Sequence, residues 1–164
     1  MVNPAISIIR DEHRSIASVL KGLLNHVAAV KAGKEEADFF LFKAMFDYIE
    51  AVPERIHHPK EDEYLFRFLR QRSVESHAVL DELEAQHVKG REDLDDLRKK
   101  MAAYEASGDI GPFDQALTAY AEFQWDHMGK EDNIVMPLAE KHLTPEDWAT
   151  INAAFEVNRS SNAW

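Results

Sequence analysis

Apolar residues recur along the chain at alternating steps of three and four, the spacing that brings side chains onto one face of an α-helix. Asn3 and Pro4 form a typical helix start, and Gly33 is a typical stop after the first long run. Four such apolar stripes follow one another, over residues 6–30, 39–68, 80–104 and 113–138. The pattern therefore predicts four long helices that each bury one face.

Short loops separate the four stripes, which favours an antiparallel, up-down-up-down four-helix bundle of the all-α class. A short fifth helix is expected next, because Thr144 suits the N-cap, Pro145 the first position and Asp147 the third. With 164 residues and no linker-like segment, the chain is expected to form one domain over residues 1–164. The expected helices cover about residues 4–32, 36–70, 74–106, 112–141 and 145–157.

Two of the stripes carry histidine and glutamate at positions expected to face the core. The second stripe consists of Phe39, Phe42, Phe46, Ile49, Pro53, His57, Glu61, Tyr64 and Phe68. The fourth consists of Phe113, Leu117, Tyr120, Gln124, His127, Glu131, Ile134 and Leu138. Charged side chains are almost never buried without a partner, so these positions need an explanation beyond packing.

Composition narrows the classes of function. The chain has no cysteine, which excludes a disulfide scaffold, a thiolate metal site, an iron–sulfur cluster and a cysteine nucleophile. Its 30 acidic and 19 basic residues give a net charge of −11, which disfavours binding to nucleic acid. It has no apolar run long enough to span a bilayer, and charged residues come too early for a signal peptide. We expect a soluble, cytoplasmic protein without a membrane or nucleic-acid partner.

Eight histidines in a chain without cysteine leave nitrogen and oxygen as the ligands for any metal. The segment HHPKED at residues 57–62 resembles HMGKED at residues 127–132, 70 residues further on. The pairs Glu12-His13 and Gln86-His87 repeat with an offset of 74. The chain therefore resembles a duplicated pair of helices, in which each pair supplies one lone histidine and one His-x-x-x-Glu.

The spacing within and between these segments points to a single metal layer. Residues four apart lie on the same helix face, so each His-x-x-x-Glu can bind one metal or bridge to a second. Counted from the connecting loops at about 1.5 Å per residue, the four histidines fall at one depth of the bundle. The predicted metal ligands are His13, His57, Glu61, His87, His127 and Glu131.

In these residues the chain resembles the hemerythrin-like, or HHE cation-binding, family, from His13 to about His142. The resemblance implies a four-helix bundle that holds two non-haem iron ions with an oxo or hydroxo bridge. It implies that Glu61 and Glu131 bridge the irons and that the four histidines are terminal ligands. It further implies binding of oxygen, nitric oxide or peroxide.

The chain departs from the respiratory hemerythrins at one ligand. They place a further histidine four positions before the ligand of the third helix, and this chain has Leu83 there. The position is then left open or to water, or it is filled by Glu84 or His58. On an α-helix, His58 points about 100° away from His57, which favours an exposed or supporting place for it. Asp132 is a weaker alternative to Glu131 as the bridge.

The sequence allows two interpretations for each of several residues near the repeat. Pro59 and Gly129 stand at matching places between histidine and glutamate, where a kink or a π-type bulge would explain both helix-breaking residues. Asp62 and Asp132 follow the glutamates and either face solvent or support the ligand imidazoles.

A centre that binds small molecules is one of several functions that these residues could serve. One alternative is a regulatory module that senses or handles iron. A metal centre of this kind is compatible either with a binding protein or with an enzyme. Another is a ferritin-like di-iron oxidase, whose Glu-x-x-His spacing occurs at Glu54–His57 and Glu84–His87. The latter is disfavoured, because the first helix offers His13 where that pattern needs glutamate.

Overall fold

Helices make up all regular secondary structure in residues 2–157, the part of the chain that the computed structural model describes. The first bundle helix is α1 (Pro4–Lys31), and the third is the 3₁₀ turn η3 (Val74–Ser76) followed by α5 (His77–Ser107). Residues 1 and 158–164 of the expected domain lie outside the described part.

The second and fourth bundle helices are composite. The second consists of α2 (Phe39–Ile49), η1 (Glu50–His57), α3 (His58–Lys60), η2 (Glu61–Phe66) and α4 (Arg67–Arg72). The fourth consists of α6 (Gly111–Lys130), η4 (Glu131–Val135) and α7 (Met136–His142), and α8 (Pro145–Glu156) follows it. The segments η1, η2 and η4 are π-helical, so each of their turns takes up an extra residue.

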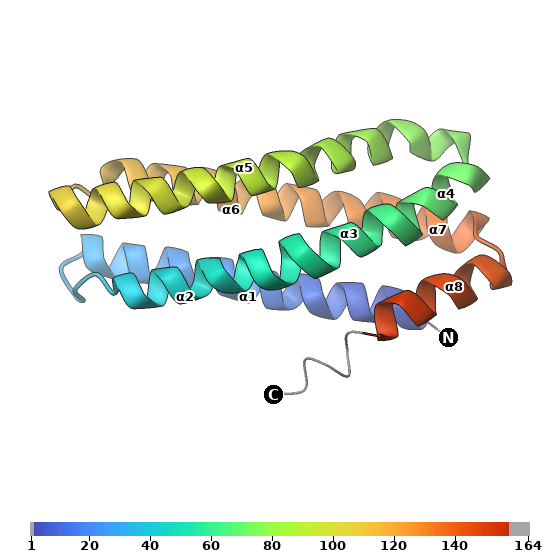
Figure 1. Cartoon of the computed structure of the whole chain (residues 1–164), viewed down its shortest axis with the longest axis horizontal. Coiled ribbons are helices and arrows are strands. Elements are labelled where there is room, and N and C mark those ends of the chain that lie inside the picture. The colour runs from blue at the N-terminus through green and yellow to red at the C-terminus, as the bar shows by residue number, and fades with distance from the viewer. Residues whose placement is uncertain (1, 158–164) are drawn as a thin grey trace.

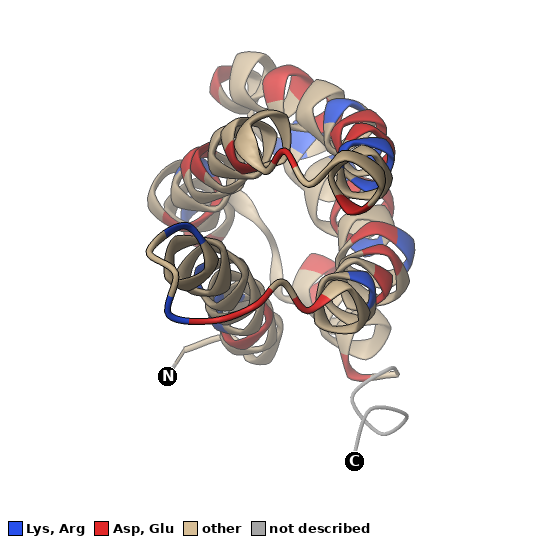
Figure 2. Cartoon of the chain, turned by 90° about the vertical axis from the view of Figure 1, so that its left-hand side faces the viewer, with Lys and Arg blue, Asp and Glu red and all other residues tan. Residues whose placement is uncertain are grey.

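The four bundle helices run alternately in opposite directions and are joined by short connections at both ends (Figure 1). Viewed along the bundle they surround a common centre, with charged residues distributed over all of them (Figure 2). α8 folds back over one end and packs against α1 and η2. The predicted all-α, up-down-up-down bundle with a short fifth helix is confirmed.

Local sequence explains where several helices begin and end. The side chain of Asn3 accepts a hydrogen bond from the amide of Ala5 at 3.3 Å, and that of Asp38 accepts one from Leu41 at 2.9 Å. Gly108 follows α5 with a φ of 77°, a left-handed conformation that glycine adopts without strain. These signals fix where the helices begin and end, and thereby place the polar segments of the four bundle helices at one depth of the bundle.

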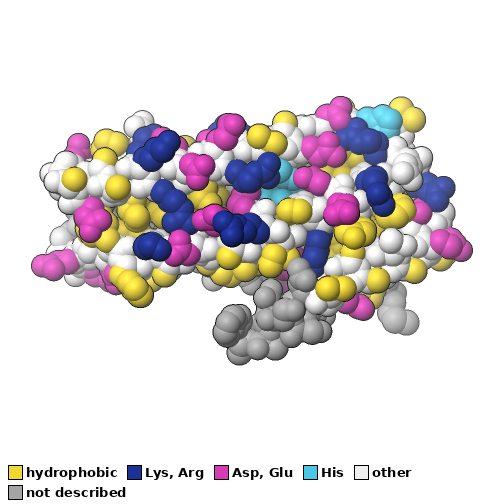
Figure 3. Space-filling model, viewed as in Figure 1, with side chains coloured by type: hydrophobic (Ala, Val, Ile, Leu, Met, Phe, Trp, Pro, Cys, Tyr) yellow, Lys and Arg dark blue, Asp and Glu magenta, His cyan; other side chains and the backbone are white. Residues whose placement is uncertain are grey.

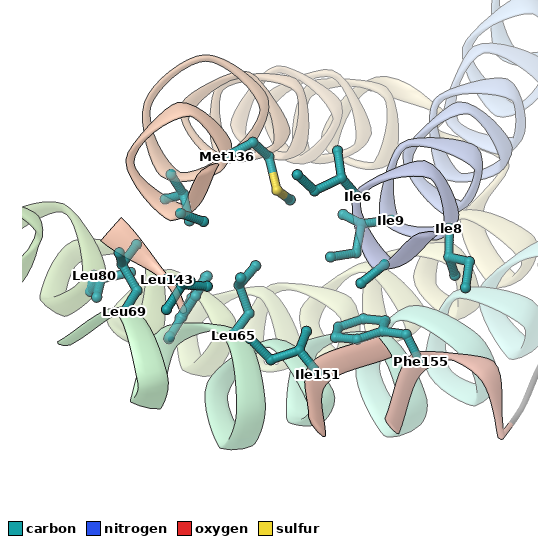
Figure 4. Close-up of a cluster of buried hydrophobic side chains, with 14 of the residues drawn as sticks. Ile6, Ile8, Ile9, Leu65, Leu69, Leu80, Met136, Leu143, Ile151 and Phe155 are labelled. Carbon is teal, nitrogen blue, oxygen red and sulfur yellow. The ribbon is translucent and has the colours of Figure 1, made fainter. Parts of the chain in front are cut away.

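The apolar core is divided into two clusters along the bundle. One cluster lies at the end covered by α8 and includes Ile6, Ile9, Leu65, Met136, Ile151 and Phe155 (Figure 4). The other lies toward the opposite end and includes Leu20, Leu23, Phe42, Phe46, Leu97 and Phe113. Each bundle helix places a buried histidine, and the second and fourth also buried glutamate, at the boundary between the two clusters. Burial of these clusters supplies the main favourable free energy of folding.

The π-helical segments change which residues of the second bundle helix face inward. The α-helical period predicted Tyr64 and Phe68 as core positions, and both are only partly buried. Leu65 and Leu69 are fully buried instead. The prediction was wrong here because the extra residue taken up by η2 shifts the inward face by one position.

The fourth bundle helix shows the same shift at the matching positions. Ile134 was predicted to face the core, but its side chain is 44% exposed, and Leu138 is partly buried. Val135 and Ala139 are fully buried in their place. The π segment η4 begins 70 residues after η2, so the duplication extends to this change of helical register.

Pro59 and Gly129 stand beside these irregular segments. Pro59 lies in α3, between η1 and η2, and Gly129 lies two residues before η4. A proline cannot donate the main-chain hydrogen bond that an α-helix requires, and glycine weakens a helix interior. The prediction of a π-type distortion at both places is confirmed.

The surface carries acidic and basic side chains intermixed with apolar ones, as Figure 3 shows for one face. Within residues 2–157, no helix combines the length and the apolar character needed to cross a membrane.

The docking of α8 depends on Asp147, which is 4% exposed. It completes a capping box with Thr144 and accepts hydrogen bonds from Arg72 at 2.8 and 3.0 Å. Asp147→Ala is expected to lower the free energy of unfolding by about 1–3 kcal/mol, measured by urea denaturation. Bonding to Arg72 lowers the pKa of Asp147, so this difference should shrink as the pH falls below 3.8.

Glu146→Ala is the matched control, because this residue is exposed in the same first turn of α8. It is expected to change the free energy of unfolding by no more than about 0.5 kcal/mol. Equal effects of the two substitutions at neutral pH would contradict the role given to Asp147.

Candidate metal centre

Six inward side chains from the four bundle helices meet in the layer between the apolar clusters. They are His13 of α1, His57 of η1, Glu61 of η2, His87 of α5, His127 of α6 and Glu131 of η4. Each of them is at most 5% exposed. The structure thus brings together all six residues that the sequence predicted as ligands.

Glu61 lies among imidazoles from three helices. Its Oε1 is 3.0 Å from Nε2 of His57 and 3.8 Å from Nε2 of His13. Its Oε2 is 3.4 Å from Nε2 of His87. One carboxylate therefore faces donors on opposite sides, as a bridging ligand must.

Glu131 occupies the corresponding place in the second half of the duplication. Its Oε2 is 3.0 Å from Nε2 of His13, and its Oε1 is 3.0 Å from Nε2 of His127. The same Oε1 lies 3.7 Å from Nε2 of His87. Asp132, the weaker alternative to Glu131, is 33% exposed and lies on the outer side of His13.

The donor atoms form two groups of four that share one residue. The first group is His58, Glu61, His87 and His127, and the second is His13, His57, Glu61 and Glu131. Within each group the donor atoms lie within 4.8 Å of one another, and all the residues are buried. The arrangement can hold two neighbouring cations, with Glu61 between them.

Many of these buried atoms are close to one another without being hydrogen-bonded. Among the described residues, both carboxylate oxygens of Glu61 and of Glu131 have no hydrogen-bond partner, and neither has Nε2 of His13 or of His57. Leaving such atoms unsatisfied in the core costs free energy. Nitrogen and carboxylate donors aimed at common points are what a transition-metal ion requires, so the residues fit a metal.

His58 belongs to the centre, contrary to the expectation that it points away. It is 4% exposed, and its ring stacks on that of His87 with centroids 4.1 Å apart. The expectation assumed α-helical geometry, whereas η1 ends at His57 and η2 begins at Glu61. A π-helical turn holds more residues than an α-helical turn, so successive side chains diverge less around the helix axis, and both histidines are buried here.

Glu84, the other candidate for the missing ligand, lies away from the centre. Its side chain is 40% exposed and accepts a hydrogen bond from Arg70 at 3.1 Å. Leu83, where respiratory hemerythrins have histidine, is buried in the apolar cluster near α8. The sequence held one signal for His58, namely two adjacent histidines followed by a proline inside a helix.

Polar partners hold the outer nitrogens of the first-half ligands. Nδ1 of His13 lies 3.2 Å from Oδ1 of Asp132, and Nδ1 of His57 contacts the carboxylate of Glu12. These bonds leave Nε2 of each ring directed into the layer. Asp132 thus supports a ligand imidazole, which decides between the two interpretations left by the sequence.

The second-half ligands are held in the same way. Nδ1 of His87 lies 2.8 Å from Oδ1 of Asp62, and Nδ1 of His127 lies 2.8 Å from Oε1 of Gln86. Asp62 and Asp132 are related by the offset of 70, and Glu12 and Gln86 by that of 74. The duplication therefore includes the residues that orient the ligands.

The carboxylates also determine the charge of the imidazoles. Burial alone would lower the pKa of His87, but Asp62, Glu131 and Glu61 raise it to about 12. Burial alone would raise the pKa of Glu61, yet His57 and His13 hold this pKa well below the ordinary value. The carboxylates thus favour the protonated form of His87, and a metal ion that binds to this imidazole must compete with a proton.

The remaining three histidines lie away from the centre. Nδ1 of His26 lies 2.7 Å from Glu35, and Nε2 of His77 lies 2.9 Å from the main-chain oxygen of Arg70. Nε2 of His142 lies 2.8 Å from Oε1 of Glu75. Their bonds secure loops and helix ends.

An all-α bundle with buried histidines and carboxylates in its interior defines a class of metal-binding protein. The family model of the hemerythrin HHE cation-binding domain matches residues 5–139, which is most of the chain. The chain therefore belongs to this family. A search of curated proteins found no match.

The two candidates for the missing ligand can be separated by substitution. His58→Ala is expected to weaken cation binding by at least about 100-fold, the upper range for the loss of a supporting group. Glu84→Ala should leave binding unchanged, because that side chain pairs with Arg70 outside the centre. Isothermal titration with Co²⁺ measures both, and equal affinities for the two variants would contradict the assignment.

Proposed function

We propose that the protein is a non-haem di-iron protein that binds oxygen, nitric oxide or peroxide at a carboxylate-bridged centre. The observation that carries the proposal is the unequal division of imidazoles between two donor groups that share Glu61. One group has three histidines and one glutamate, and the other has two histidines and two glutamates. The group with fewer imidazoles is the better candidate to leave a coordination position for a small molecule.

In this proposal the chain contributes ligands, orientation and a dry interior. Glu61 and Glu131 would bridge the two irons, and the five histidines would be the terminal ligands. The partners on Nδ1 keep four of the imidazoles aimed inward. Phe66 lies parallel to the ring of His87, with centroids 5.8 Å apart, and shields it from water. The iron, when bound, supplies the redox chemistry.

Two other functions are compatible with parts of the site. A module that senses or handles iron would use the same ligands, and it differs in showing little consumption of peroxide or nitric oxide. A ferritin-like oxidase is less well supported, because it needs a second Glu-x-x-His pair. Glu84 of that pair bonds to Arg70 instead. A cytoplasmic location remains part of the proposal.

The metal content of purified protein, loaded with iron under anaerobic conditions, tests the proposal directly. We expect about two irons per chain, as donor groups that share a bridging carboxylate would bind. After oxidation, the protein should show a near-ultraviolet or visible charge-transfer band that shifts when azide is added. A colourless protein without iron after loading would refute the proposal.

Two variants serve as controls for this measurement. His57→Ala removes a candidate ligand and should lower the iron content sharply. His26→Ala removes a histidine that bonds to Glu35 and should leave the iron content as in the wild type. Equal iron contents in the two variants would contradict the placing of the centre.

Chelation is expected to destabilise the fold, because it leaves the buried carboxylates without a cation. A cation at about 1,000 times its Kd stabilises by about 4 kcal/mol, so its removal should lower Tm by on the order of 10 °C. Calorimetry of loaded protein with and without chelator measures the change. The double variant Glu61→Gln, Glu131→Gln is the control and should melt at the same temperature in both conditions. An unchanged Tm for the wild type would contradict this prediction.

A further inference from the structure

A row of acidic residues on the second bundle helix leads toward the metal centre. Asp47, Glu50 and Glu54 precede His58 at steps of three, four and four residues. Asp47 and Glu50 are 49% and 39% exposed, whereas the side chain of Glu54 is only 3% exposed. The row therefore runs from the surface into the interior and ends at a residue of the three-histidine group.

Glu54 connects the outside of the bundle to this group. Its Oε2 lies 3.4 Å from Nδ1 of His58. The same residue also lines a hollow in the surface between η1 and α5, together with Glu50, Arg55, Arg91, Leu94 and Asp95. Glu54 therefore lies between the hollow and a candidate ligand.

Within the described part of the chain, the carboxylate of Glu54 has no hydrogen-bond partner, whereas those of Asp47 and Glu50 pair with an arginine. Arg98 lies 3.0 Å from Oδ1 of Asp47 and 2.9 Å from Oε2 of Glu50. Over residues 2–157, neither oxygen of Glu54 has a hydrogen-bond partner. A buried carboxylate left in that condition costs free energy unless a ligand visits it.

The third bundle helix makes room for this carboxylate. Gly90 of α5 faces Glu54, and a Cβ atom at Gly90 would lie 3.4 Å from Oε1 of Glu54 and 3.2 Å from Nε2 of Gln124. The space beside Gly90 is thus occupied by polar atoms of two other helices.

The second half of the duplication has no such row. The residues 70 positions after Asp47, Glu50, Glu54 and His58 are Leu117, Tyr120, Gln124 and Met128. All four of these side chains are buried in the interior of the bundle, and none is a carboxylate. The fold therefore does not require carboxylates at these places, and their presence on one side calls for a chemical reason.

We propose that Glu54 is the site through which a divalent metal cation is taken up from solvent into the three-histidine group. The cation would enter the hollow, exchange water for the free oxygens of Glu54, and then pass to His58. This inference rests on the proposed function of the centre. Carboxylate oxygens and imidazole nitrogens both bind divalent transition-metal ions, so the transfer needs no change in the kind of ligand chemistry.

A purely structural role for Glu54 makes a different prediction. If Glu54 only oriented His58, as Asp62 orients His87, its removal would lower the equilibrium affinity and leave the rate of uptake unaffected. An uptake site has the opposite effect, because it changes the rate and leaves the occupied centre the same. Rate and final content must therefore be measured on the same samples.

The experiment is stopped-flow mixing of metal-free full-length protein with Co²⁺, followed by the visible absorbance of bound Co²⁺. Glu54→Gln keeps the shape of the side chain and is expected to slow uptake by at least about tenfold, as loss of a steering charge does. The final Co²⁺ content per chain should equal that of the wild type. Glu54→Asp keeps a carboxylate and should restore most of the rate. Glu122→Gln removes an exposed charge on α6 and should leave the rate unchanged.

The outcomes separate this inference from the function on which it rests. Wild-type protein that binds no Co²⁺ would overturn the proposed metal centre itself. An uptake rate in Glu54→Gln equal to that of the wild type would overturn the uptake site alone. A normal rate with a reduced final content would overturn it too and assign Glu54 to the orientation of His58. Slow uptake to full content, with recovery in Glu54→Asp, would support it.

Discussion

The structure depends on the burial of two carboxylates in one layer of the bundle. Glu61 and Glu131 are fully buried, and moving an ionised carboxylate out of water costs several kcal/mol even after relaxation. The imidazoles that lie 3.0 Å from their oxygens offset part of that cost by charge, and metal ions would offset more. The burial of the apolar clusters on both sides of the layer contributes favourable free energy that offsets the remaining cost. The layer can therefore be polar only because it is narrow and is closed off at both ends.

The π-helical segments reconcile this layer with the rest of the bundle. An α-helix turns one residue in three or four inward, which would give each helix a single ligand per turn. Where η1, α3 and η2 meet, His57 and His58 are both buried, so one helix supplies two imidazoles, with Glu61 one turn further on. The cost is a weaker helix at Pro59. The ligand contacts and the packing of Leu65 and Phe66 below the layer compensate for it.

Sequence reasoning reached the bundle and the six inward residues because both depend on period and repetition. Amphipathic stripes predict helices, and two copies of one short motif at matching depths predict a shared layer. The predictions for His58, Tyr64 and Ile134 were wrong, and all three assume an α-helical period in helices that contain the π-helical segments η1, η2 or η4. In the sequence, Glu54 stands out only through its ferritin-like spacing from His57. Its carboxylate lies in the space beside Gly90 of another helix, a contact that the sequence does not reveal.

The duplication also shows where the two halves of the molecule have become different. The candidate ligands His57 and His127, the buried carboxylates Glu61 and Glu131, and the aspartates that bond to two of the histidines are matched pairs. The two halves differ at His58 and Glu54. At the matching positions, 70 residues further on, the second half has Met128 and Gln124. A symmetric pair of metal sites needs none of these differences for its stability. In the proposed centre the two sites are unequal, and these differences give one of them a third imidazole and a carboxylate on the side of the surface hollow.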